Sequence, residues 1–395
     1  MESVCAGTVG RALSSACLDR FSVRKICYQI NLQPSLGGGE IYTRFLTHAL
    51  SSMGWDSVLV VARDASFWKA FMPSGVHYRP VWDMVTLQSA LPEHPALILT
   101  HSALPEEMAP AVASRHRLCG VVHMPLYERS PRGLQHYHRL FAVSDHVRNS
   151  ALSHGLANLH PEPLYAVADL APRGESRAVM SGSPYEWDRR KFRDRFLGWG
   201  QRTFNINAGG VPYSRSSEIS IGIVSRLTPI KQFPEMLSIL APFIAKHAGV
   251  KLEIFGSGGY ASIRDMMRAL LPAREQVRWW GPQSDVAAVY RNLDYVISGL
   301  PEKEALGLNL IEAQMCGTPV LAVRAPPFTE TVVDKVSGYL FCDPRKDEGR
   351  EFAQLLDHLG DRDIRPDPRR ATEHLARFSA AAFQARLERA LEALV

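Results

Sequence analysis

Short apolar runs alternate with segments of helical periodicity along most of the chain, and this alternation constrains the fold more than any other feature. In the first half, the strand-sized runs lie at 25–30, 57–61, 96–100, 120–123 and 140–144. In the second half, comparable runs lie at 219–224, 251–255, 293–298 and 319–323. Strands that alternate with helices form parallel sheets through crossover connections. The sequence therefore predicts an α/β protein with two doubly wound, Rossmann-like halves.

The regular pattern breaks down between about residues 161 and 217, where Pro, Gly, Ser and charged residues dominate. Such a composition is typical of a linker or an insertion. The predicted order is an N-terminal extension (1–23), a first domain (24–175), a linker or insertion (176–217), a second domain (218–375) and a closing amphipathic helix (376–395). With 395 residues, of which 46% are hydrophobic, the chain has ample material for two cores.

Several features bear on the compartment. No apolar run approaches the roughly eighteen residues that a membrane span needs, and the first twenty residues lack the apolar core of a secretory signal. The six cysteines are dispersed without paired spacing, which argues against both a disulfide framework and a zinc site. We therefore expect a protein of the reducing cytoplasm.

The net charge of +5 is mild, but positive charge concentrates between residues 115 and 148. Its members are Arg115, His116, Arg117, Arg129, Arg132, His136, His138, Arg139 and Arg148. This stretch is either a solvated basic face or a surface for anionic lipid headgroups or an anionic acceptor, which would place the protein at the inner face of a membrane. Nucleic acid is not expected as a partner, because no aromatic-rich recognition module accompanies the charges.

The most informative segment is 304–322, which has two acidic residues eight positions apart, Glu304 and Glu312. Between them, Gly307, Leu308 and Asn309 form a turn that opens a helix. The start of a helix presents free backbone N–H groups and a positive dipole, which bind anions, and carboxylates accept hydrogen bonds from sugar hydroxyls. One segment of this kind can hold phosphate, ribose and sugar together.

A second segment, 222–231, delivers Arg226 and Lys231 into the loop beyond a predicted strand. Ligands of open parallel sheets bind at the carboxyl ends of the strands, where two cations can clamp a diphosphate. Charge that develops on a departing nucleoside diphosphate would be neutralised there.

These two segments resemble the signatures of the family 4 retaining glycosyltransferases, which have the GT-B fold. The resemblance implies two Rossmann-like domains with a cleft between them, a UDP- or GDP-sugar donor, and transfer of a hexose-type sugar with retention to a saccharide or lipid-linked saccharide of bacterial surface polysaccharide assembly. It implies that Arg226 and Lys231 stabilise the leaving group with the backbone of Gly307 and Leu308. Glu304 would orient the sugar and Glu312 the ribose.

Weaker matches extend the resemblance to other loops. Gly38 and Gly39 would face the donor phosphates from the N-terminal domain, and the turn with Gly256 and Gly258 would lie near the nucleotide base. His123 resembles the family histidine that approaches the donor sugar. Ser144 and Glu330 match further family positions.

The sequence contains no recognisable metal or cofactor site. It has no H-E-x-x-H or D-x-D motif with supporting context, and the Gly37–Gly39 loop is neither a Walker loop nor a clean dinucleotide fingerprint. We therefore expect no metal and no cofactor apart from the donor substrate, with fixed cations serving where other glycosyltransferases use a divalent ion.

The sequence also departs from the family. Gln232 replaces the glycine after the lysine, Pro326, Pro327, Phe328 and Thr329 replace a turn of small residues, and Asp169 lacks the usual surroundings. Three other functions remain open: a sugar-nucleotide epimerase, a non-catalytic sugar-nucleotide-binding subunit, and an NAD dehydrogenase. A soluble small molecule also remains possible as the acceptor.

Overall fold

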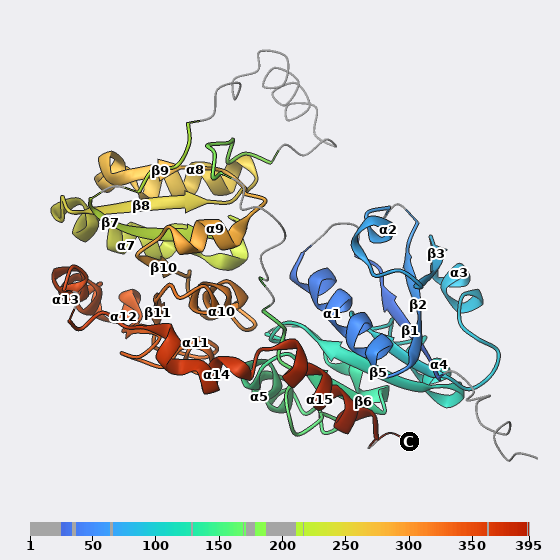
Figure 1. Cartoon of the computed structure of the whole chain (residues 1–395). Helices are drawn as coiled ribbons and strands as arrows, with labels where there is room; N and C mark the ends of the chain where they lie inside the picture. Colours follow the sequence, from blue (N-terminus) through green and yellow to red (C-terminus); the bar gives the residue numbers. More distant parts are fainter. Residues whose placement is uncertain are drawn as a thin grey trace, which may run out of the picture.

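The computed structural model describes residues 25–33, 37–63, 66–127, 129–168, 170, 178–186, 211–215, 217–361, 363–392 and 394. They form two α/β domains, blue to green and yellow to red in Figure 1, and the last helix returns to the first domain. Within the described residues, no helix combines the length and the apolar character needed to cross a membrane.

The N-terminal domain is built on a six-stranded parallel sheet in the order β3-β2-β1-β4-β5-β6. Its strands are β1 (Lys25–Asn31), β2 (Trp55–Ala62), β3 (His77–Val81), β4 (Leu97–Thr100), β5 (Arg117–Val122) and β6 (Arg139–Ala142). Its helices are α1 (Gly38–Ser52), α2 (Trp68–Phe71), α3 (Met84–Ser89), α4 (Ala109–Arg115), the 3-10 helix η1 (Arg132–His136) and α5 (Asp145–Ser153).

The C-terminal domain repeats this topology in a second parallel sheet, in the order β12-β11-β10-β7-β8-β9. Its strands are β7 (Ile219–Val224), β8 (Val250–Phe255), β9 (Val277–Trp279), β10 (Tyr295–Ile297), β11 (Val320–Val323) and β12 (Gly338–Phe341). Its helices are η2 (Pro229–Lys231), α7 (Phe233–Lys246), α8 (Tyr260–Ala269), η3 (Leu271–Gln276), α9 (Val286–Arg291), α10 (Leu308–Met315), α11 (Phe328–Thr331), α12 (Pro344–Asp347) and α13 (Arg350–His358).

Both sheets have the strand order of a Rossmann fold, so the prediction of two doubly wound domains is confirmed. The order reverses between β1 and β4 in one sheet and between β7 and β10 in the other. At such a switch point the loops leave the sheet in opposite directions and open a space beyond the strand ends, where ligands of this architecture bind. The predicted site segments follow β1, β7 and β10.

Parts of the predicted 176–217 linker pack on the C-terminal domain. Met180 forms an antiparallel bridge with Pro212, and Tyr185 a parallel bridge with Gly258. The side chain of Val179 lies in the C-terminal core. Residues 187–210 of this predicted linker lie outside the described residues.

The chain returns to the N-terminal domain through η4 (Pro368–Ala371), α14 (Thr372–Ala376) and α15 (Ala380–Glu392). Phe383, Leu387 and Leu391 of α15 are buried in the N-terminal core, so the apolar face of this amphipathic helix packs on the first domain. A small apolar cluster joins the domains beside them, comprising Tyr165, Ala168, Leu306, Ile311, Leu375 and Phe378.

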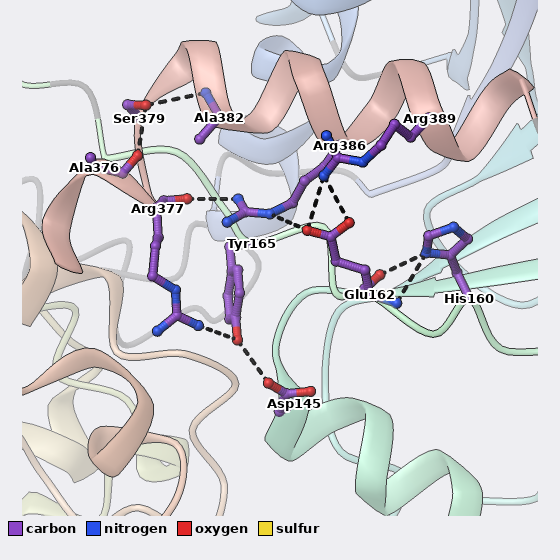
Figure 2. Close-up of polar contacts among 10 residues, drawn as sticks. All are labelled: Asp145, His160, Glu162, Tyr165, Ala376, Arg377, Ser379, Ala382, Arg386 and Arg389. Carbon is purple, nitrogen blue, oxygen red and sulfur yellow. Dashed lines mark hydrogen bonds and ion pairs between the residues drawn. The ribbon is translucent and has the colours of Figure 1, made fainter. Parts of the chain in front are cut away.

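Polar contacts fix this return crossing (Figure 2). The guanidinium of Arg386 donates to Glu162 Oε1 at 3.1 Å and to the carbonyl oxygen of Arg377 at 2.6 Å. Arg377 donates to the hydroxyl of Tyr165 at 3.0 Å, and that hydroxyl donates to Asp145 at 2.8 Å. Because Asp145 begins α5, the crossing is tied to the N-terminal domain at two places.

We expect Arg386→Met to lower the melting temperature by roughly 3–10 °C, because it removes charge-assisted hydrogen bonds from a side chain that is 10% exposed. Arg389→Met is the matched control, since Arg389 also contacts Glu162 but is 57% exposed. Differential scanning calorimetry measures both. Equal shifts in melting temperature for the two variants would show that the buried Arg386 contributes no more to stability than the exposed Arg389.

Candidate functional site

An ion pair between Lys231 and Glu304 lies at the switch point of the C-terminal sheet. Lys231 ends η2, after β7, and Glu304 lies in the loop after β10. The backbone N–H of Ala305 also donates to Glu304 Oε1 at 3.1 Å. Burial alone raises the pKa of Glu304, but the Lys231 ammonium and the N–H groups of Ala305 and Gly307 hold it below its usual value. Glu304 is therefore an ionised carboxylate in the free protein.

Three glycines allow the loops after β7, β8 and β10 to meet. A Cβ added to Gly256, whose φ is 146°, would lie 1.9 Å from the carbonyl oxygen of Ser225. At Gly258 it would lie 2.3 Å from that of Leu227, and at Gly299 1.8 Å from that of Lys231. No side chain fits at these distances. Gly256 and Gly258 thus set the backbone on either side of Arg226, and Gly299, which the sequence analysis missed, sets that of Lys231.

Helix α10 begins at Leu308 after Gly307, whose left-handed backbone (φ 78°) turns the polypeptide away from the loop between β10 and α10, which contains Glu304 and is called the acidic loop. Gly307 cannot cap the helix with a side chain, so the N–H groups of Leu308 and Asn309 are left at the helix start. Both side-chain polar atoms of Asn309 are buried without a hydrogen-bond partner in the described part of the chain. An anionic ligand at this helix start would meet free N–H groups and the positive end of the dipole.

Glu312 lies one turn into α10 and accepts a hydrogen bond from the hydroxyl of Tyr290 at 3.0 Å. Burial raises the pKa of Glu312 to about 7, although the Tyr290 hydrogen bond and the Lys231 charge oppose the shift. Glu304 and Glu312 therefore differ in protonation near neutral pH, because only Glu304 has a direct cationic partner. Tyr290, buried on α9, is a partner that no sequence signal identified.

The glycine loop of the N-terminal domain approaches Arg226 from the other side. Gly37 is extended, and Gly38 and Gly39 begin α1. A Cβ added to Gly37 would lie 3.3 Å from Arg226 Nη1 and 3.1 Å from Glu40 Oε2. Gly38 and Gly39, in contrast, have no atom within 4 Å of an added Cβ. The structure thus brings the first glycine of the loop to Arg226, while the two predicted site glycines face open space.

His123 directly follows β5, at the same edge of the N-terminal sheet as the glycine loop. Its Nε2 lies 3.1 Å from Nδ1 of His101, which directly follows β4. Burial lowers the pKa of His123 to about 4, so its ring is neutral at physiological pH. The sequence analysis missed His101, although the two histidines share the same position after adjacent strands.

The two weaker family positions join the domains. The carboxylate of Glu330 accepts hydrogen bonds from the backbone N–H groups of Asp145 (2.9 Å) and His146 (2.6 Å) at the start of α5. Ser144 donates its hydroxyl to the carbonyl oxygen of Ala305 at 2.6 Å. These contacts attach the N-terminal domain to the acidic loop itself.

The family departures have local consequences. Gln232 adopts the left-handed conformation (φ 52°), in which the glycine of the family pattern is at no steric disadvantage. The peptide bond between Pro326 and Pro327 is cis. Asp169 lies outside the described residues.

A group of metal-type ligands within the described residues lies away from this site: Cys342 directly after β12, Asp347 at the end of α12 and Glu351 on α13. Its carboxylates are already engaged. Asp347 accepts from the N–H groups of Gly349 and Glu351, and Glu351 pairs with Arg324. This group gives no reason to place a metal beside Lys231 and Glu304.

Residues 213–365 match the model of the family "Glycosyl transferases group 1". The D-inositol 3-phosphate glycosyltransferase of Segniliparus rotundus is 33% identical over 171 residues, which are 41% of this chain and 37% of that protein. The enzyme of the same name from Saccharomonospora viridis is 29% identical over 56% of this chain and 51% of its own length. This chain therefore matches about a third to a half of the length of these relatives.

Solved structures match nearly the whole chain. Anabaena HepE in complex with UDP and glucose has a TM-score of 0.66 at 15% identity, covering 93% of this chain and all of that one. The apo form of the lipopolysaccharide outer core galactosyltransferase WaaB has a TM-score of 0.65 at 14% identity, over 94% of this chain and all of that one. The chain has the GT-B fold, as predicted.

We expect Gly299→Ala to disturb the Lys231 backbone and to weaken binding of a nucleoside diphosphate at least tenfold, because a methyl group cannot fit 1.8 Å from a carbonyl oxygen. Gly259→Ala is the control, since an added Cβ there has no atom within 4 Å. Calorimetric titration with UDP and GDP, with circular dichroism to confirm folding, compares the two. Unchanged binding in a folded Gly299→Ala protein would remove Gly299 from the site.

Proposed function

We propose that the chain is a retaining glycosyltransferase that moves a hexose-type sugar from a nucleoside-diphosphate sugar to an acceptor hydroxyl. One observation carries the proposal. Lys231 pairs with the ionised carboxylate of Glu304 just before the start of α10, and Arg226 follows the same strand, β7, as Lys231 at the carboxyl edge of a Rossmann-like sheet. Anion-binding groups next to a hydroxyl-binding carboxylate suit a ligand that joins a diphosphate to a sugar.

In the proposed mechanism, the diphosphate lies between Arg226, Lys231 and the N–H groups of Leu308 and Asn309. These groups stabilise the charge that develops on the leaving nucleoside diphosphate, and their fixed positions lower the cost of reorganisation. In the free protein Glu304 neutralises Lys231. When the phosphate pairs with Lys231 in place of Glu304, Glu304 becomes available to accept hydrogen bonds from the sugar. Glu312 accepts hydrogen bonds from the ribose.

The N-terminal domain supplies the opposite wall. Gly38 and Gly39 have open space around the backbone, since a Cβ added to either would meet no atom within 4 Å. In the proposal, this backbone lies beside the phosphates and His123 faces the sugar. Retention follows from attack on the same face that the phosphate leaves, with a departing phosphate oxygen taking the acceptor proton. This chemistry needs no residue to act as a covalent nucleophile.

We propose that no divalent metal takes part, because Arg226, Lys231 and the helix start supply the positive charge. Activity should persist in excess chelator. Loss of activity in chelator, with recovery on adding Mn²⁺, would contradict this part of the proposal.

The acceptor is proposed to be a saccharide or lipid-linked saccharide of a bacterial surface polysaccharide, at the cytoplasmic face of the membrane. Support comes from the basic stretch between 115 and 148. Arg115, Arg117, Arg129 and Arg132 are exposed there, whereas His116 is buried. Exposed arginines attract anionic headgroups or an anionic acceptor.

The decisive assay incubates the full chain with UDP- and GDP-sugars, beginning with UDP-glucose, and with an acceptor panel that includes inositol 3-phosphate and lipid-linked saccharides. We expect a glycoside whose anomeric configuration, read by proton NMR, equals that of the donor. A rearranged donor sugar without acceptor would indicate an epimerase, and binding without turnover a non-catalytic subunit. Either result, or inversion, would overturn the proposal.

We expect Lys231→Met to lower kcat by about 100-fold or more, because one preorganised group on the leaving charge is lost. Lys251→Met is the matched control, since Lys251 also lies near a carboxylate, Glu218, but on β8 away from the site. The double variant Lys231→Met/Glu304→Gln serves as a folding control, because it leaves no buried carboxylate unpaired. Near-normal kcat in Lys231→Met would exclude Lys231 from the reaction.

We expect nucleotide binding to release protons through Glu312. In the free protein, the protonated form of Glu312 adds to the free energy of unfolding, and this contribution is lost as pH rises through the pKa of Glu312, about 7. Ribose hydroxyls donate to the ionised form, so they favour proton release. At pH 7 a group of pKa about 7 is half protonated, and complete ionisation releases about half a proton.

Calorimetry of UDP binding in buffers of different ionisation enthalpy counts the released protons. Affinity should weaken as pH falls below about 7 in the parent protein. In Glu312→Gln both the release and this pH dependence should disappear. Identical proton release by the two proteins would show that Glu312 does not meet the nucleotide.

A further inference from the structure

A chain of buried polar side chains runs from helix α1 through β1 to His123. Gln29, fully buried on β1, donates from Nε2 to Thr47 Oγ1 at 2.8 Å and lies 3.3 Å from Ser57 Oγ. Its Oε1 lies 3.3 Å from Nε2 of His101, whose Nδ1 lies 3.1 Å from Nε2 of His123. Each side chain of this hydrogen-bonded series lies within hydrogen-bond distance of the next.

The donor and acceptor roles in this hydrogen-bonded series are fixed at its buried end, at Thr47. The hydroxyl of Thr47 donates its only proton to the carbonyl oxygen of Thr43 at 2.8 Å. Its oxygen can therefore only accept a hydrogen bond from Gln29, so the amide nitrogen of Gln29 faces Thr47. The amide oxygen of Gln29 consequently faces His101, and it can only accept.

The acceptor on Gln29 decides which nitrogens carry protons in the two histidines. His101 must donate from Nε2 to Gln29. Burial, with a contribution from His123, lowers the pKa of His101 well below its usual value, so the ring is neutral and its Nδ1 is an acceptor. His123 must then donate from Nε2. Its own Nδ1 is left with a lone pair, and in the described part of the chain no residue bonds to it.

We propose that Gln29 and His101 are positioning residues that fix His123 in the Nε2–H tautomer, so that its Nδ1 accepts a hydrogen bond from a hydroxyl of the bound ligand. The choice of a sugar as that ligand rests on the proposed function. A neutral acceptor excludes phosphate and carbonyl oxygens, which carry no proton to donate. Whereas Arg226 and Lys231 attract phosphate, the Nδ1 atom of His123 accepts a hydrogen bond from a hydroxyl and offers nothing to an anion.

Aromatic packing supports the same geometry. The ring of Tyr42 meets His123 edge-on with centroids 4.9 Å apart, and meets Phe383 of α15 at 5.5 Å. The Tyr42 hydroxyl is occupied, because it donates to the carbonyl oxygen of Leu164 at 2.9 Å. The ring orientation of His123 is thus held by packing, and its proton placement by Gln29 and His101.

The test is a long-range proton–nitrogen NMR spectrum of the full chain labelled with ¹⁵N-histidine, in which protonated and unprotonated ring nitrogens are distinguished directly. The His123→Gln and His101→Asn variants assign the signals. Near neutral pH we expect both rings to be Nε2–H tautomers. An Nδ1–H form of His123, or a tautomer mixture, would overturn the proposal whether or not the chain transfers sugar.

Two variants test the cause of the tautomer. Thr47→Val removes the nearer of the two hydroxyls that face Gln29 Nε2, and Gln29→Met removes the acceptor for His101, so both should give mixed tautomers at His123. Thr47→Ser retains the hydroxyl and should preserve the parent spectrum. A single Nε2–H tautomer in both Thr47→Val and Gln29→Met would show that Gln29 does not set it.

Binding separates a positioning role from a merely structural one. In Gln29→Met we expect affinity for a nucleoside-diphosphate sugar to fall about fivefold, while affinity for the free nucleoside diphosphate stays unchanged, because only the sugar hydroxyl loses its acceptor. An equal loss for both ligands, or no loss for either, would contradict the positioning role of Gln29.

Discussion

The site depends on backbone contacts that only glycine permits. The loops after β7, β8 and β10 meet with their main chains nearly touching, at Gly256 against Ser225, Gly258 against Leu227 and Gly299 against Lys231. Because the contacts are between backbone atoms, the positions of Arg226 and Lys231 do not depend on how flexible side chains pack. A charged pair built on such a frame is preorganised, which is the property that electrostatic stabilisation of a leaving group requires.

A second constraint is that the two domains are joined at the site as well as at the chain crossings. Ser144 and Glu330 connect α5 to the acidic loop and to α11. The crossing network around Tyr165, Arg377 and Arg386 lies next to α5, because Asp145 belongs to both (Figure 2). A change in the angle between the domains would therefore have to break or rearrange contacts that also define the wall of the site.

Much of this could be predicted from the sequence, and the limits have physical causes. Strand-sized runs and helical spacing predicted the inner strands of both sheets but missed the edge strands β3, β9 and β12. Motifs after strands predicted that Lys231 and Glu304 lie together, because the carboxyl ends of parallel strands share one edge. Gly299, Tyr290 and His101 were missed because their roles depend on which distant backbone or side chain they meet. Gly37, and not the predicted Gly38 or Gly39, approaches Arg226. Which glycine does so depends on how the two domains pack together, and no local sequence pattern indicates that.

The most direct test of the central claim is a crystal structure of the chain with UDP or GDP bound. We expect the diphosphate to contact Arg226, Lys231 and the N–H groups at the start of α10, with the ion pair between Lys231 and Glu304 opened and the ribose on Glu312. A nucleotide bound away from the β7–β10 switch point, or a diphosphate that leaves Lys231 paired with Glu304, would contradict the claim.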